Sequence, residues 1–292
     1  MRRAYREQIF ECGNYMDVQV YPVFKKASGT RKKAYKPTSE VQEKLNAKNS
    51  ANYLSRLINL NFTKKDYELH LVYDDEFLPN TPERAEKDVV NFLRRAKRLY
   101  QKVGAELKYI YGTEVGERSG RLHHHITISG GVSRSALEGL WKFGFANTKA
   151  LKFKKTGAAG LAHYVTKQKL LKRRFSCSQN LKRPEPKERT GRISHRTLDF
   201  WKTFLSSEED FKAQIDKLYP GYTLCKMPDI EENDVNGGIY TYIRLIKNEF
   251  LKEVEPDPKD RSVQMCQRGN PKLILESLKN YTDSSTKRRT KH

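Results

Sequence analysis

Residues 113–128 of this 292-residue chain read TEVGERSGRLHHHITI, in which a turn bracketed by two glycines leads into three consecutive histidines and a β-branched run. Two strand-like segments around such a turn are typical of a β-hairpin. Side chains alternate between the faces of a strand, so His123 and His125 point to one face and His124 points to the other. We expect this hairpin to organise both the sheet and the chemistry of the protein.

The segments around the hairpin alternate between strands and helices. Hydrophobic periodicity predicts strands at 67–73, 107–114, 122–129 and 146–153, and helices at 82–103, at 133–141 and from Thr156 to about Arg174. The flanks are predicted to hold strands at 15–21 and 238–245 and helices at 39–58 and 197–218. The central order is β-α-β-β-α-β-α, with a hairpin in the middle. It predicts an α+β fold in which helices pack on an antiparallel β-sheet, and it argues against a doubly wound parallel fold.

The chain is expected to have four parts. Residues 1–59 form a basic N-terminal extension, and residues 60–192 form the domain that holds the hairpin. Residues 193–252 form a C-terminal α/β extension. Residues 253–292 are rich in charged and polar side chains, and we expect them to be a flexible tail.

Composition indicates a polyanionic partner. The chain has 57 Lys and Arg against 35 Asp and Glu, a net charge of +22, and a pI of about 9.7. Nucleic acid is the usual partner of such a protein, and the absence of a long apolar run or a signal-peptide core argues against a membrane. The four cysteines are scattered without a Cys-x-x-Cys pair, which argues against a disulfide scaffold or a zinc knuckle. We therefore expect a cytoplasmic protein.

One part of the chain lacks acidic residues. Between Gly139 and Pro184 there are twelve Lys and Arg and no Asp or Glu. A charge run is often only a solvated face, but an unbalanced run of this length around a candidate nucleophile favours contacts with phosphates. The residues expected to bind nucleic acid are Lys169, Lys172, Arg173 and Arg174.

Two histidines on one strand face form the expected metal site. The imidazoles of His123 and His125, together with a carboxylate, are suitable ligands for a divalent cation such as Mn²⁺ or Mg²⁺. In a tight hairpin Glu114 faces the start of the next strand, whereas Glu117 lies in the turn, so Glu114 is the expected third ligand. The alternative is a surface strand that carries histidines without a metal. No role is expected for the isolated histidines, which are His70, His195 and His292.

Tyr164 is the expected nucleophile. It lies three residues before Lys167, so the two side chains share one helical face, and Gly157 and Gly160 allow a close backbone approach. The alternative is an ordinary buried tyrosine, one of sixteen in the chain. Nearby cations are expected to lower the pKa of Tyr164 from its usual value of about 10. A metal site and a tyrosine together suggest phosphoryl transfer to the tyrosine hydroxyl.

Three segments together resemble the HUH endonuclease superfamily, and in particular its single-tyrosine rolling-circle replication initiators from small phages, plasmids and related mobile elements. The first segment is a strand that runs into residues 71–79, LVYDDEFLP. The second spans residues 114–126, and the third is the Tyr-x-x-Lys sequence at residues 164–167. The resemblance covers about residues 60–185 and is specific because all three segments occur in the family's order.

The resemblance implies a two-layer α+β sandwich and a role for each site residue. His123 and His125 would bind the metal, with Glu114 as the third ligand. Tyr164 would attack the scissile phosphate of single-stranded DNA at a replication origin, and Lys167 would position the nucleophile or the metal shell. No Walker A motif occurs in the chain, so a helicase and a polymerase would come from the host.

The chain departs from the family pattern at two places. His124 stands where the family has a bulky apolar residue, and residues 69–72 read LHLV where the family usually has Leu-Thr-Leu-Thr. Three alternatives remain open. They are an HUH-type transposase or relaxase, a non-catalytic DNA-binding regulator of the same fold, and a histidine-based phosphodiesterase of unrelated fold.

Overall fold

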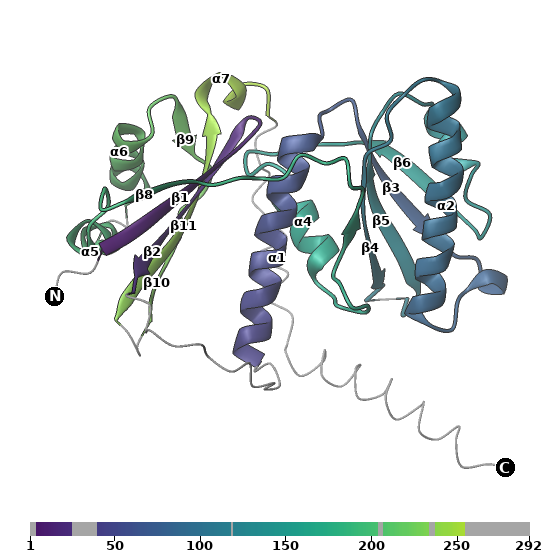
Figure 1. Ribbon diagram of the computed structural model, residues 1–292, viewed down its shortest axis with the longest axis horizontal. Helices are drawn as coiled ribbons and strands as arrows, with labels where there is room; N and C mark the ends of the chain where they lie inside the picture. The colour runs from purple at the N-terminus through teal and green to yellow at the C-terminus, as the bar shows by residue number, and fades with distance from the viewer. Residues whose placement is uncertain (1–3, 25–39, 118, 204–206, 234–236, 255–292) are drawn as a thin grey trace, which may run out of the picture. The chain divides into compact units, whose positions relative to one another are not determined.

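The helices and strands of the protein build two antiparallel sheets with helices packed against them (Figure 1). The structure is a computed structural model that describes residues 4–24, 40–117, 119–203, 207–233 and 237–254. None of the helices in these ranges is both long enough and apolar enough to cross a bilayer. The predicted α+β fold with antiparallel strands is confirmed. Most of the expected tail, residues 255–292, lies outside the described part of the chain.

A five-stranded sheet carries the hairpin. Its strands lie in the order β6-β3-β5-β4-β7. They are β3 (Tyr67–Val72), β4 (Tyr109–Val115), β5 (Leu122–Ile128), β6 (Ala146–Ala150) and β7 (Ser176–Cys177). β5 lies between β3 and β4 and pairs antiparallel with both. The predicted order of strands and helices through this region is confirmed.

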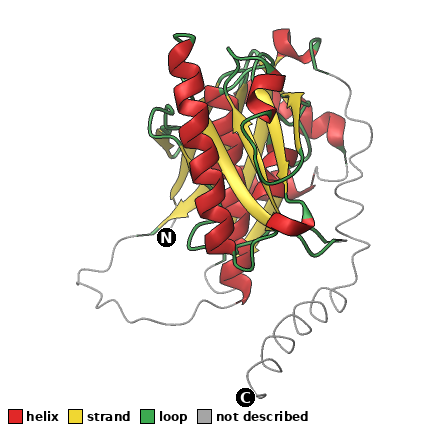
Figure 2. Cartoon of the chain, turned by 90° about the vertical axis from the view of Figure 1, so that its right-hand side faces the viewer, coloured by secondary structure: helices red, strands yellow, loops and turns green. Residues whose placement is uncertain are grey.

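Helices cover both faces of the five-stranded sheet (Figures 1 and 2). The helices of this region are α1 (Glu40–Asn61), η1 (Asp75–Phe77), α2 (Pro82–Lys102), α3 (Arg134–Glu138) and α4 (Ala159–Thr166). Leu69 and Leu71 point to the face that packs on α2, where they share a buried core with Phe92. On the other face, Ile110 shares a core with Ala162 of α4 and with buried leucines of α1. Strand alternation therefore separates a purely structural face from the face that α4 approaches.

The beginning and the end of the described chain form a second sheet together. Its elements are β1 (Ala4–Cys12), β2 (Tyr15–Val23), β8 (Lys187–Thr190), β9 (Tyr222–Leu224), β10 (Asp229–Asn233), β11 (Gly238–Lys247), α5 (His195–Thr203), α6 (Glu208–Leu218) and α7 (Asn248–Leu251). β2 pairs with β11, and β1 pairs with β8. Aromatic and aliphatic side chains of α5 and α6 cover one face of this sheet. The expected N-terminal and C-terminal extensions thus share one sheet, while their boundaries at residues 59, 192 and 252 stay predictions.

The helix predicted from Thr156 to Arg174 is wrong at both ends, because α4 is only eight residues long. Gly157 takes a left-handed φ of 68°, which stops the helix from starting at the predicted residue. The free N–H of Ala158 donates to the side chain of Asn59 at 3.0 Å, so Thr156 does not cap the helix. The basic residues after α4 therefore lie on an irregular segment instead of on a helical face.

Two further elements differ from the sequence prediction. The helix predicted at residues 197–218 is two helices, and Ser207 caps the second one by accepting a hydrogen bond from the Asp210 N–H at 3.4 Å. β1 was not expected, because its alternating pattern is masked by the acidic residue Glu7 on its buried face. Glu7 accepts hydrogen bonds from Arg192 at 2.9 Å and from Tyr219 at 2.5 Å, which makes its burial possible.

Asp17 on β2 is the centre of a buried ion cluster. Its carboxylate accepts hydrogen bonds from Arg56 of α1 at 2.9 Å and from Arg244 of β11 at 2.8 and 3.0 Å. Tyr242 also donates its hydroxyl hydrogen to this carboxylate. Burial raises the pKa of Asp17, but the two guanidinium groups outweigh this effect and lower the pKa. The cluster ties α1 to the six-stranded sheet.

The Asp17→Asn substitution should lower the free energy of unfolding by about 3–5 kcal/mol, because it leaves two buried guanidinium groups without a counter-charge. Since the pKa of Asp17 is lowered, its contribution is present at neutral pH and is lost as the pH falls through the folded-state pKa. Urea unfolding should therefore separate the variant from the wild type at neutral pH and bring them together in acid.

The control for this experiment is Glu188→Gln, which removes an ion pair with Arg6 that spans 3.1 Å at the protein surface. Its effect should not exceed about 1 kcal/mol. Equal losses for Asp17→Asn and Glu188→Gln would show that the buried cluster does not stabilise the fold.

Candidate active site

The register of β5 brings the expected metal ligands together. His123 lies directly opposite Glu114 on β4, and His125 lies opposite Gly112 on the same strand. On the other side of β5, His125 lies opposite His70 of β3. All of these residues point to the sheet face that α4 approaches, as strand alternation predicts. Three strands therefore supply imidazole and carboxylate groups to one place.

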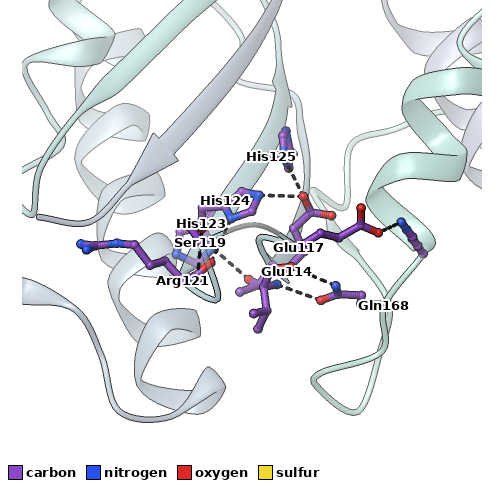
Figure 3. A network of polar contacts seen from close by, with 11 residues as sticks. Glu114, Glu117, Ser119, Arg121, His123, His124, His125 and Gln168 are labelled. Atoms are coloured by element: carbon purple, nitrogen blue, oxygen red, sulfur yellow. Dashed lines mark hydrogen bonds and ion pairs between the residues drawn. The ribbon is translucent and has the colours of Figure 1, made fainter. Parts of the chain in front are cut away.

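Glu114 links the two histidines (Figure 3). Its Oε1 lies 2.6 Å from Nε2 of His123 and 3.2 Å from Nε2 of His125. Burial raises the pKa of Glu114, but the hydrogen bonds to the two histidines outweigh it and lower the pKa to about 2. The carboxylate is therefore ionised at neutral pH. These contacts support the expectation that Glu114, rather than Glu117, completes the ligand set.

His70 is a site residue that the sequence analysis missed. Ligand atoms of His70, His123 and His125 all lie within 4.8 Å of one another. The rings of His70 and His125 stack with their centroids 4.5 Å apart. The available signal was strand alternation, because His70 lies between Leu69 and Leu71, which belong to the opposite face. An isolated histidine in a strand becomes informative once the neighbouring strand is known.

The donor atoms of this cluster fit a divalent cation. Within the described residues, Nε2 of His70 and Nδ1 of His125 are buried and have no hydrogen-bond partner. Burial lowers the pKa of His70 to about 4, and the neighbouring histidines contribute to this shift, so its imidazole is neutral and keeps a lone pair for a metal at neutral pH. Nδ1 of His123 donates to the carbonyl oxygen of Arg121 at 3.2 Å, which turns Nε2 towards Glu114. Imidazole nitrogens with one carboxylate suit Mn²⁺.

His124 belongs to the opposite face and has a structural environment. Its side chain is fully buried, and its two ring nitrogens lie 2.9 Å from the hydroxyl of Tyr73 and 2.8 Å from the hydroxyl of Thr113. Burial lowers the pKa of His124 to about 3, so the ring is neutral. Two hydroxyl partners thus allow a polar ring to occupy the core position where the family has an apolar side chain.

Tyr164 lies next to the histidine cluster. Its ring meets His125 edge-to-face with the centroids 4.8 Å apart, and 47% of the side chain is exposed. The expected lowering of its pKa is not found in this protein. Partial burial raises the pKa of Tyr164, and the negative charges of Glu114 and Glu117 add to the effect, giving about 12. The hydroxyl is therefore protonated at neutral pH.

Lys167 and Gln168 connect the end of α4 to the hairpin. The ammonium of Lys167 pairs with the carboxylate of Glu117 in the turn, so its charge is directed away from Tyr164. The side-chain amide of Gln168 makes two hydrogen bonds with the backbone of Val115, accepting at 2.8 Å and donating at 2.9 Å (Figure 3). This amide satisfies both backbone groups of one β4 residue and holds the end of α4 against the strand.

Gly112 allows α4 to lie close to β4. A Cβ atom at this position would lie 2.6 Å from Cγ1 of Val165 and 3.0 Å from its carbonyl oxygen, both too short for ordinary contacts. Val165 follows Tyr164 directly in the chain, so a larger residue on β4 would push the tyrosine away from His125. The absence of a side chain at residue 112 is thus part of the site geometry.

The expected nucleic-acid-binding residues all line one groove after α4. Lys169, Lys172, Arg173 and Arg174 contribute to a groove of about 590 Å³ whose opposite wall is α1. Arg174 differs from the other three, because it pairs with Glu43 and donates to the carbonyl oxygen of Thr166 at 3.0 Å. Its charge is largely compensated inside the protein, and its DNA-binding role stays a prediction.

Comparison with known proteins adds information about family. Residues 66–169 match a family of replication-associated proteins, the ORF2 family. The matched segment contains all the residues of the cluster, namely His70, Glu114, His123, His125 and Tyr164. The match supports a replication-associated protein with an initiator role. The chain has no significant match among curated proteins or among solved structures.

Alanine substitution of His70, His123 or Glu114 should weaken Mn²⁺ binding by about tenfold or more, because each removes a donor from one cluster. Isothermal titration calorimetry measures this directly. The matched control is Glu117→Ala, which removes a carboxylate that pairs with Lys167 in the same hairpin. If Glu117→Ala weakened binding more than Glu114→Ala did, the carboxylate ligand would lie in the turn.

Proposed function

We propose that the protein is a rolling-circle replication initiator that nicks single-stranded DNA at a specific site and transfers the strand in a metal-dependent reaction. The observation that carries the proposal is the edge-to-face contact of Tyr164 with His125, inside the cluster that His70, His123 and Glu114 complete. The family match over residues 66–169 supports it independently. A net charge of +22 suits a polyanionic substrate.

The proposed reaction forms a tyrosine ester of DNA. The oxygen of Tyr164 forms a bond to the scissile phosphorus, and the bond from phosphorus to the 3′ oxygen breaks. The hydroxyl proton leaves Tyr164, and the released 3′ oxygen takes up a proton, so the products are a 5′-phosphotyrosine link and a free 3′ hydroxyl. Because one phosphoester replaces another, the reaction can reverse and join the strand again.

The residues of the chain divide the work of this reaction. His70, His123, His125 and Glu114 would hold the cation, and a bound Mn²⁺ or Mg²⁺ would withdraw charge from the scissile phosphate as a Lewis acid. Tyr164 supplies the attacking oxygen. Lys167, paired with Glu117, adds a positive charge near the negatively charged reacting group. A helicase and a polymerase of the host would then use the free 3′ hydroxyl.

Tyr164→Phe should abolish both nicking and the covalent adduct, because it removes only the attacking oxygen. Folding, Mn²⁺ binding and DNA binding should be retained. The assay incubates the protein with Mn²⁺ and single-stranded fragments of its own replicon, and mass spectrometry locates the nucleotide on the trapped peptide. The control is Tyr111→Phe, which changes a mostly buried tyrosine on β4 near the site.

Three results of this assay would change the assignment. A nucleotide on a residue other than Tyr164 would move the nucleophile. DNA binding by the wild type without any adduct would favour a non-catalytic regulator of the same fold. Cleavage at transposon ends, in place of an origin hairpin, would favour a transposase.

Gln168→Ala should reduce the rate of nicking by about tenfold or more while leaving Mn²⁺ affinity unchanged. The substitution removes the two hydrogen bonds that hold the end of α4 on β4, so Tyr164 loses its position. Single-turnover kinetics at saturating Mn²⁺ measures the effect. The control is Gln101→Ala, because that exposed amide lies on α2, away from the α4 contact. Full activity of Gln168→Ala would contradict a positioning role.

A further inference from the structure

The groove after α4 has one wall from each of two segments that are far apart in the sequence. Four residues of α1 form the first wall, spaced three or four apart along one helical face. They are Glu43, Asn46, Ser50 and Tyr53. The second wall comes from residues 169–183, on the irregular segment and on β7. The α1 wall lies entirely outside the segment that matches the replication-associated family.

Three cations in this groove have no counter-charge. Lys169, Lys172 and Arg173 make no ion pair or hydrogen bond with any other residue that the structure describes, and all three are exposed. Arg183 contacts uncharged groups, among them the thiol of Cys177 at 3.4 Å. The acidic group of the groove, Glu43, is already paired with Arg174. The groove therefore has an excess of positive charge that is available to a ligand.

Two aromatic rings lie among these cations. Tyr53 of α1 and Phe175 of the opposite wall approach with their ring centroids 6.5 Å apart and tilted by 31°. Tyr53 is 38% exposed, which is unusual for a large aromatic residue on a packed helix. Cations that can contact phosphates, together with aromatic faces on which bases stack, are the features of a site for unpaired nucleotides.

The groove is directly connected to the candidate active site. Arg174 of the groove donates to the carbonyl oxygen of Thr166, at the end of the helix that carries Tyr164. Ser176, also in the groove, pairs with Tyr111 of β4, the strand that carries Glu114. A strand of DNA that leaves the active site past the end of α4 would meet the groove.

We propose that this groove binds the single-stranded DNA that flanks the cleaved phosphodiester, with Tyr53 and Phe175 stacking on bases and Lys169, Lys172, Arg173 and Arg183 contacting phosphates. The proposal rests on the proposed function for its substrate. It adds a binding site built by α1, so the N-terminal extension takes part in holding DNA. Bases are accessible to such rings only when the strand is unpaired, so the groove selects single strands over duplexes.

The test measures DNA binding in the Tyr164→Phe background, so that no cleavage occurs. The probe is a labelled oligodeoxythymidylate of about 20 nucleotides, longer than the roughly 4–16 nucleotides that one such groove holds. Tyr53→Leu should weaken binding by about tenfold at every salt concentration, because a stacked base is lost. Lys172→Gln combined with Arg173→Gln should make the slope of log affinity against log salt shallower by about 0.7 for each lost cation.

Two controls separate the groove from general effects of charge and folding. Lys97→Gln combined with Arg98→Gln removes the same charge from exposed positions on α2, which covers the opposite face of the sheet, and should leave binding unchanged. Tyr53→Phe keeps the ring and should bind as tightly as the parent protein. If Tyr53→Leu also bound normally, or if the α2 variant weakened binding as much as the groove variant, the proposal would be wrong.

A crosslinking experiment distinguishes failure of the groove from failure of the proposed function. An oligonucleotide that contains 5-iodouracil should crosslink on irradiation to Tyr53 or Phe175, and crosslinks confined to other residues would overturn the groove. Adduct formation by the protein with an intact Tyr164 is scored separately. Absence of the adduct together with weaker binding of the groove variants would refute the nickase and retain the groove.

Discussion

The simultaneous pairing of β5 with β3 and β4 is the constraint on which the site depends. Because side chains alternate along a strand, a shift of one residue in this register would turn His123 and His125 into the core and bring His124 to the site. The observed register sets His125 between His70 and Gly112 and sets His123 opposite Glu114. Burial of the intervening apolar residues against α2 stabilises this register over its alternatives.

The second requirement is that α4 approaches the same face closely. Gly112 leaves room for the helix, and Gln168 fixes its end to β4 through two backbone hydrogen bonds. The six-stranded sheet contributes indirectly. The cluster around Asp17 holds Arg56 of α1, and α1 packs on α4. The segments outside the family match thereby support the helix that carries the proposed nucleophile.

Local patterns made much of this architecture predictable, and contacts between distant segments set the limit. The histidine run and the turn beside it were sufficient to place His123, His125 and Glu114 on one face, because strand alternation is a local rule. His70 could not be recognised in the same way, since its importance depends on which strand lies beside β5. The short length of α4 and the pKa of Tyr164 were also missed, because partners from α1 and β4 decide both.

The central claim is that one divalent cation binds among these side chains next to Tyr164. The most direct measurement is anomalous diffraction from crystals of the protein grown with Mn²⁺. The account predicts one strong anomalous peak at coordination distance, roughly 2.0–2.3 Å, from imidazole nitrogens of His123 and His125 and from a Glu114 oxygen. A crystal saturated with Mn²⁺ whose peaks all lie away from these three residues would contradict it.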